Sequence, residues 1–131
     1  MASFESLDFL YTPSRDVASD MTDLADALGA RVVFAIDDGG IRVAMLELTD
    51  APPNILLTDH VDGERPIMVY RVADHRATVD RLTGGGWTVS RSLEIPQGPC
   101  TSFRSPGGHR IAVYQLVRPT VLEHFAGRRD F

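Results

Sequence analysis

The sequence has only one cysteine and no lysine. The first shortage excludes proteins held together by disulfides or by thiolate-bound zinc. Cys100 has no partner for an intrachain disulfide, and a thiolate-cluster zinc site is excluded with it. All 13 basic residues are arginine and are scattered along a chain with a formal net charge of −5. Arg128 and Arg129 are interpreted as part of a solvated tail. Because a phosphate backbone requires a clustered basic surface, we expect no nucleic-acid partner.

Long apolar runs are also missing. No stretch approaches the roughly 20 apolar residues that a membrane-spanning helix needs. The first residues include Asp8 and Asp16 and show no basic segment leading into an apolar one. We therefore expect a cytoplasmic protein with no membrane partner. The 131 residues, of which 44% are hydrophobic, are enough for one core, so a single domain over 1–131 is expected.

What the sequence does contain is one layout that occurs twice. A short apolar strand runs into an aspartate and then into a helix, first over 9–16 and again over 67–74. Apolar residues recur at helical spacing over 17–28, and Gly29 is expected to end that helix. The second helical face is shorter and ends at the glycines of 84–86. The order of elements, more than side-chain identity, indicates a repeat.

Strand-forming runs follow each expected helix. The run over 31–36 is rich in Val, Phe and Ile, and further strands are expected over 41–48, 54–58, 87–95, 98–104 and 110–116. Residues 105–108 have Pro and Gly where a type II turn requires them, which predicts a hairpin. The expected fold is therefore α+β, with two βαβββ modules at about 5–58 and about 66–117. A polar linker at 59–65 and a tail at 118–131 complete the chain.

The tail is extra to the repeat. Pro119, Val121, Leu122 and Phe125 give it a short amphipathic pattern. Because so short a segment is not a stable helix by itself, it must dock on its own domain or on a second subunit.

The two modules resemble the vicinal-oxygen-chelate (VOC) superfamily of glyoxalases, bleomycin-resistance proteins and extradiol dioxygenases. The resemblance covers about residues 5–117, and its most specific part is FRSPGGHRIAVY at 103–114, which is similar to the family's closing hairpin. It implies that each module forms a half-barrel and that a small-molecule ligand lies on the concave side. It also implies paired subunits, so we expect a homodimer, for which the tail offers an apolar surface.

Metal-dependent members of that family place four ligands on the first and last strands of the two modules. The corresponding positions here are Phe9, approximately Leu56, Ile67 and Ala112. None of these side chains has a lone pair for a cation. We therefore expect neither a metal nor another cofactor.

Further candidates share the expected concave faces by the two-residue alternation of strands. The predicted ligand-binding residues are Phe9, Tyr11, Leu56, Ile67, Cys100, Ser102, Arg104, Ala112 and Tyr114. The tyrosine hydroxyls either meet a ligand or are satisfied within the protein. Cys100 is either a reactive thiol or a small buried apolar group.

The remaining polar residues give weaker signals. The four histidines, in no metal-binding spacing, are interpreted as partly exposed: His60, His75, His109 and His124. Arg42, Arg71 and Arg104 lie within strands, and any of them on a concave face would favour an anionic ligand. Glu47 and Glu94 are either exposed acids, partners for such an arginine or general bases.

These observations predict a metal-independent small-molecule-binding protein that holds an apolar or aromatic compound. The alternative is an enzyme: a glyoxalase-like lyase or dioxygenase-like oxidoreductase that uses substitute ligands or no metal, or a metal-free isomerase. A third possibility is a structural or partner-binding module whose concave side is filled by its own side chains. No catalytic residue can be assigned from the sequence.

Overall fold

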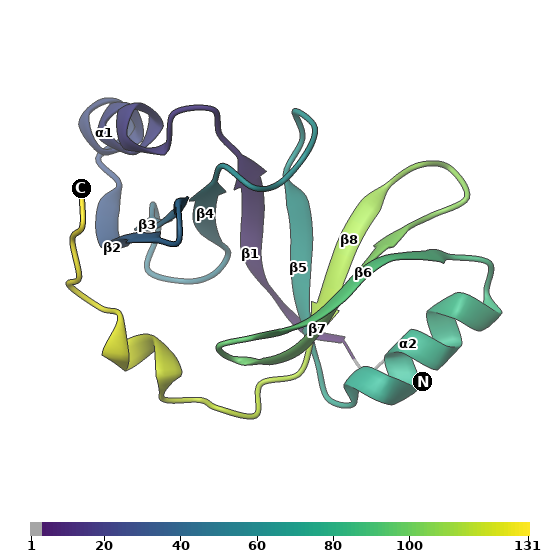
Figure 1. Cartoon of the computed structure of the whole chain (residues 1–131). Coiled ribbons are helices and arrows are strands. Elements are labelled where there is room, and N and C mark those ends of the chain that lie inside the picture. Colours follow the sequence, from purple (N-terminus) through teal and green to yellow (C-terminus); the bar gives the residue numbers. More distant parts are fainter. Residues whose placement is uncertain (1–3) are drawn as a thin grey trace. The chain divides into compact units, whose positions relative to one another are not determined.

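The computed structural model describes residues 4–131, which form two α-helices, eight strands and one short 3-10 helix (Figure 1). In chain order the elements are β1 (Phe4–Pro13), α1 (Val17–Leu28), β2 (Arg31–Asp38), β3 (Ile41–Glu47), β4 (Asn54–Thr58), β5 (Ile67–Val72), α2 (His75–Gly84), β6 (Thr88–Ile95), β7 (Gly98–Arg104), β8 (Arg110–Tyr114) and η1 (Val121–His124). The order βαβββ thus occurs twice, which confirms the predicted α+β architecture. No helix in this part of the chain has the length and apolar character needed to cross a membrane.

The chain divides into two compact units, named here by their helices. The α1 unit contains Phe9–Pro66 and Glu123–Phe131. The α2 unit contains residues 4–8 and Ile67–Leu122. Strand β1 therefore contributes its first half to the α2 unit and its second half to the α1 unit.

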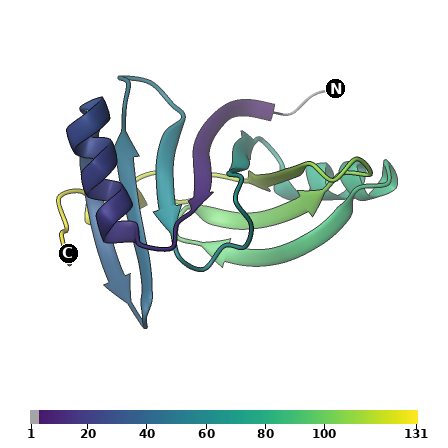
Figure 2. The same cartoon turned by 90° about the horizontal axis from the view of Figure 1, so that it is seen from above.

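In the α1 unit the strand order is β2-β3-β4-β1, with β1 parallel to β4 and the other neighbours antiparallel. Helix α1 packs on one face of these strands, as Figure 2 shows from above. Val17 and Met21 on the helix are buried against Leu46 and Leu57 of the sheet. The opposite face of this sheet is therefore not covered by α1.

Local signals set both ends of α1 as predicted. The Asp16 carboxylate accepts a hydrogen bond from the Ser19 amide at 3.0 Å, which satisfies one free donor of the first turn. At the other end Gly29 has a φ of 71°, a conformation that glycine adopts without a steric penalty.

In the α2 unit the strand order is β1-β5-β8-β7-β6, with β5 parallel to β8 and the β6–β7 and β7–β8 pairs antiparallel. Helix α2 begins after Asp74, whose carboxylate accepts from the Ala77 amide at 3.0 Å. Phe103 and Val113 form the buried centre of this unit, and Val79 and Leu82 of the helix pack against their cluster. The sheet face with Phe103 and Val113 is thus the covered one.

The hairpin between β7 and β8 forms as predicted, but the turn type was wrong. The Gly108 amide donates to the Ser105 carbonyl at 2.9 Å. A type II turn would give Gly107 a positive φ, whereas the positive value, 87°, belongs to Gly108. A left-handed glycine directly after the turn is typical of a type I turn followed by a bulge, which matches the twist of the strands.

The tail docks on its own chain. The Gly127 amide donates to the Val33 carbonyl at 2.8 Å, and the Asp130 amide donates to the Ala35 carbonyl at 2.7 Å. The Phe125 ring lies 5.9 Å from the Phe34 ring. The tail therefore covers the edge of β2, which would otherwise present unpaired backbone groups. The homodimer stays a prediction.

Candidate functional site

Six of the nine predicted binding residues lie together on one face of the α2 unit. The strand register pairs Cys100 with Tyr114 and Ser102 with Ala112, and residues paired directly across strands share a face. This face is opposite the one that packs against α2, and it is called the open face below. The predicted residues on it are Ile67, Cys100, Ser102, Arg104, Ala112 and Tyr114, and by the same register they share it with Val69, Arg71, Arg91 and Arg110.

A buried carboxylate organises one end of the open face. Asp8, only 9% exposed, accepts hydrogen bonds from the Tyr114 hydroxyl and the Ser6 hydroxyl, each at 2.5 Å. The Arg71 guanidinium lies 3.8 Å from Asp8 and 3.4 Å from Glu5. These donors and the nearby cation compensate the desolvation of the Asp8 carboxylate.

The Tyr114 hydroxyl is therefore used within the protein. Burial, followed by the hydrogen bond to Asp8, raises the pKa of Tyr114. Of the two alternatives for this residue, the structure gives a hydroxyl satisfied by an internal partner. The sequence analysis missed Asp8 as a site residue, although an aspartate inside a strand is an uncommon choice that could have drawn attention to it.

Cys100 lies beside Tyr114 on the open face, and burial raises the pKa of its thiol from 9.0 to about 11. We expect iodoacetamide to alkylate Cys100 near neutral pH about 100-fold more slowly than a free cysteine, because two pKa units lower the thiolate fraction by that factor. Mass spectrometry of the folded protein would measure the rate, with urea-unfolded protein as the control.

The raised pKa of Cys100 fixes how the stability of the fold and the alkylation rate depend on pH. A thiol whose pKa is raised in the folded state stabilises the fold below the unfolded pKa, and that contribution is lost as the pH rises through about 11. The alkylation rate of folded protein should therefore keep rising up to about that pH. Of the two alternatives for Cys100, the raised pKa favours the small buried apolar group, and equal rates for folded and unfolded protein would contradict it.

The other three predicted residues lie in the α1 unit. Tyr11 pairs with Leu56, and Phe9 pairs with Asn54, so Phe9, Tyr11 and Leu56 share one face. Residues 55 and 57 pack toward α1, which places these three on the face that α1 leaves uncovered. Phe9 is buried, while Tyr11 and Leu56 are half-buried.

A polar chain extends from Tyr11 on this face. The Tyr11 hydroxyl and His60 Nε2 lie 2.8 Å apart, and His60 Nδ1 lies 2.5 Å from the hydroxyl of Thr58, which is fully buried. Both ring nitrogens of His60 thus have a hydrogen-bond partner. The interpretation of His60 as a partly exposed surface histidine missed this role, since no local spacing relates it to Tyr11. Such a chain can pass a proton between phenol and imidazole.

His75 and Glu94 lie on the α2 side of their sheet. Glu47 instead shares with Met45 and Leu56 the face that α1 leaves uncovered. His75 Nε2 lies 2.8 Å from the Thr101 hydroxyl on the α2 side of the sheet, and burial lowers the pKa of His75 against the opposing effect of Glu94. Glu94 forms an ion pair with Arg118, and Glu47 forms one with Arg31. Neither glutamate is thereby positioned as a general base for the open face.

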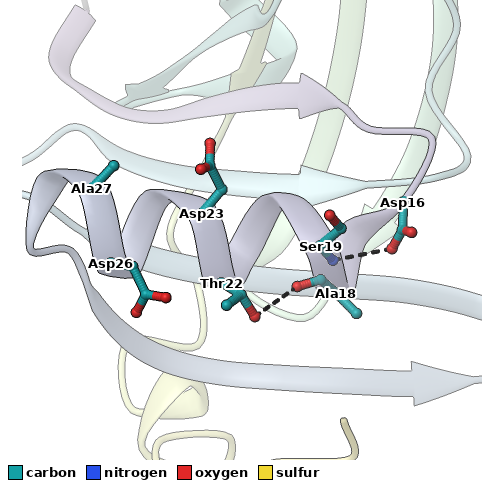
Figure 3. Close-up of a pocket in the computed structure, with 7 residues that line it drawn as sticks. All are labelled: Asp16, Ala18, Ser19, Thr22, Asp23, Asp26 and Ala27. Atoms are coloured by element: carbon teal, nitrogen blue, oxygen red, sulfur yellow. Dashed lines mark hydrogen bonds between the residues drawn. The ribbon is translucent and has the colours of Figure 1, made fainter.

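A shallow depression also runs along the outer side of α1. Its lining is Asp16, Ala18, Ser19, Thr22, Asp23, Asp26 and Ala27. Figure 3 shows the carboxylates of Asp23 and Asp26 pointing to different sides of the helix, while Asp16 caps its first turn. Because the acidic groups do not converge, this depression has no features of a binding site.

The residues at the four positions that the resemblance assigns to metal ligands do not fit a metal ion. Phe9 and Leu56 in the α1 unit, and Ile67 and Ala112 in the α2 unit, offer carbon atoms only. Over residues 4–131 no group of three or more His, Cys, Asp or Glu side chains is arranged to hold a cation. No reaction step through a bound metal can therefore be assigned to these positions.

The βαβββ order occurs twice, with a helix on one face of each unit. This is the fold expected from the resemblance to the VOC superfamily. Solved structures agree: methylmalonyl-CoA epimerase from Mycobacterium tuberculosis matches with a TM-score of 0.72 and 20% identity over 90% of this chain and 92% of that chain. A Streptomyces coelicolor methylmalonyl-CoA epimerase variant in complex with 2-nitronate-propionyl-CoA matches with a TM-score of 0.71 and 16% identity over 88% and 99%. A hypothetical protein from Bacillus halodurans C-125 matches with a TM-score of 0.70 and 14% identity over 84% and 93%.

At these identities the likeness establishes the fold, and it confirms the predicted resemblance to the VOC superfamily. The sequence itself matches no family model and no curated protein. By their names, the epimerases act on methylmalonyl-CoA. Their activity is a property of those proteins and is not carried over by the fold.

Proposed function

We propose that this protein binds a small, mostly apolar or aromatic molecule without the help of a metal ion. The observation that carries the proposal is the set of carbon-only side chains where metal-dependent relatives have ligands: Phe9, Leu56, Ile67 and Ala112. A divalent cation needs oxygen, nitrogen or sulfur ligands to replace its hydration shell, whereas an apolar molecule gains from contact with carbon. The ligand named for one structural neighbour, 2-nitronate-propionyl-CoA, supports a small-molecule partner in general.

The two uncovered faces have the composition that such a ligand favours. Half-buried Leu56 in the α1 unit and half-buried Ile67 in the α2 unit supply apolar surface, and Phe9 and Ala112 are buried beside them on the same faces. Small-molecule sites typically combine mainly apolar walls with a few polar groups that fix orientation. Ser102, half-buried on the open face, is such a polar group.

A thermal-shift screen tests this proposal. Aromatic drugs, quinones and aromatic acids would be added to the purified protein, once with EDTA and once without. A ligand that binds only the native state raises the melting temperature, by mass action, and EDTA should leave the shift unchanged. If no compound raises the melting temperature, the binding proposal is overturned. The alternative of a structural or partner-binding module is then favoured.

A second candidate function is a metal-free enzyme that moves a proton. The chain of Tyr11, His60 and Thr58 favours it, because a phenol hydrogen-bonded to an imidazole can act in general acid–base catalysis. A compound found in the screen would be incubated with the protein in deuterated water. Exchange of a carbon-bound proton that is lost in Tyr11→Phe, with binding retained, would support the enzyme. Binding without exchange favours the binding protein.

A further inference from the structure

We infer that the ligand carries one acidic group, and that this anion is held next to Ser102 by Arg91, Arg104 and Arg110 on the open face. The inference rests on the proposed function for the presence of a ligand, and it adds the charge of that ligand and the place where the charge is bound.

The strand register brings these arginines around a small residue. Arg104 pairs directly with Arg110 across β7 and β8, and Arg91 pairs with Ser102 across β6 and β7. Residues paired in this way have Cβ atoms only about 4.5–5.5 Å apart, and diagonal neighbours are within reach of long side chains. Ser102 pairs on its other side with Ala112. Two short side chains are therefore surrounded by three long cationic ones.

Arg71 on this face is paired with Asp8 and Glu5 of β1. Arg91 and Arg104, by contrast, have no acid beside them on the neighbouring strands. Strands β5, β6, β7 and β8 place no Asp or Glu on the open face, because Glu94 alternates to the other side and pairs with Arg118. Among residues 4–131 no ion pair joins Arg91 or Arg104 to a carboxylate. The chain as a whole has a charge of −5, so this is a local excess of positive charge on an acidic protein.

Like charges directly opposite each other destabilise a sheet, so the Arg104–Arg110 pair has an energetic cost. An anion beside the pair offsets that cost with charge-assisted hydrogen bonds, and the guanidinium fork matches the two oxygens of a carboxylate or a phosphate. Arg91 and Arg104 are exposed, and Ser102 is half-buried. Within the described residues 4–131, the Ser102 hydroxyl donates one long hydrogen bond, 3.4 Å to the Arg91 carbonyl, so it can turn toward a ligand.

The size of the cluster indicates a small molecule and not a polyanion. Three arginines around one serine match a single acidic group, and the net negative charge of the chain repels a nucleic acid or an anionic membrane. Val69 and Ala112 lie next to the cluster on the same face but are each only 4% exposed. The apolar part of the ligand therefore rests on the proposed function, to which the arginine cluster adds one acidic group.

Calorimetry with 2-naphthoate and its neutral analogue 2-naphthamide tests the inference. We expect the wild type to bind the carboxylate at least 10-fold more tightly than the amide. Arg91→Gln and Arg104→Gln should each weaken naphthoate binding by about 10-fold or more, since hydrogen bonds to charged groups are worth at least that factor. Neither change should affect naphthamide. Arg76→Gln, on the exposed surface of α2, removes the same charge and should alter neither affinity.

The outcomes separate the inference from the proposed function. Equal affinities for the two probes would overturn the anion inference and leave small-molecule binding intact. A preference for naphthoate that survives both Arg91→Gln and Arg104→Gln would overturn the assignment of the anion to the arginine cluster on the open face. Failure of both probes to bind would overturn the inference and count against the proposed function as well. Arg104→Lys keeps the positive charge but loses the planar guanidinium that can donate two parallel hydrogen bonds to a carboxylate. It should therefore retain part of the preference for naphthoate over naphthamide.

Discussion

Gly98→Ala is expected to destabilise the protein by about 3 kcal/mol or more, which is the upper range for overpacking. A Cβ added at residue 98 would lie 2.0 Å from the Gln115 carbonyl oxygen and 3.1 Å from Val117 Cγ2. The carbonyl belongs to the backbone, and the Gln115 amide donates to the Pro99 carbonyl at 3.2 Å. The two segments cannot separate without losing that bond. Urea unfolding followed by circular dichroism would measure the change.

Gly84→Ala is the matched control for this change. No atom lies within 4 Å of a Cβ at residue 84, which is the last residue of α2. Alanine has a higher helix propensity than glycine, so the expected effect is neutral or a stabilisation of up to about 1 kcal/mol. Unchanged stability of Gly98→Ala would mean that the chain at residue 98 does not approach the end of β8 as the structure shows.

Phe103→Ala is expected to cost about 3–5 kcal/mol, because it removes a large side chain and leaves a cavity. Phe103 is fully buried on β7 at the centre of the α2 unit, in one cluster with Val72 and Val113. The same urea experiment measures the loss, and a reduced cooperativity of unfolding would indicate that the packing of this unit is loosened.

Phe4→Ala makes the same chemical change at an exposed position. Phe4 is 38% exposed and packs edge-on against Tyr70 with ring centroids 5.4 Å apart. The expected cost is about 1–2 kcal/mol, from one aromatic contact and partial burial. Equal losses at residues 4 and 103 would contradict the position of Phe103 as the centre of the core.

The elements with local signals were predictable from the sequence. Helix α1 runs over 17–28 and ends at Gly29 as expected, because apolar spacing, a capping aspartate and a glycine act within one segment. The bounds of β4 and β7 were also predicted as the structure has them. The turn at 105–108 was wrong in type, since Pro and Gly are compatible with more than one turn and the twist of the flanking strands decides between them.

The contacts that connect distant segments were not predictable in this way. Asp8 and Tyr114 are 106 residues apart, and Tyr11 and His60 are 49 apart. No periodicity relates such pairs, because each depends on which strands become neighbours. The arginines of the open face show the same limit: they are scattered in the sequence, and only the register of β6, β7 and β8 brings them around Ser102.

The tail illustrates a choice that the sequence left open. Its apolar pattern fits docking on the same chain or on a second subunit, and the structure shows the first. Backbone hydrogen bonds to β2 and the contact of Phe125 with Phe34 decide this. A short amphipathic pattern alone therefore does not distinguish an internal contact from an interface.

Metal-independent binding is tested most directly by elemental analysis of the purified protein combined with naphthoate binding before and after EDTA treatment. With carbon-only side chains at residues 9, 56, 67 and 112, we predict no stoichiometric zinc, nickel, manganese or iron and an unchanged affinity. A stoichiometric metal whose removal abolishes naphthoate binding would contradict this prediction.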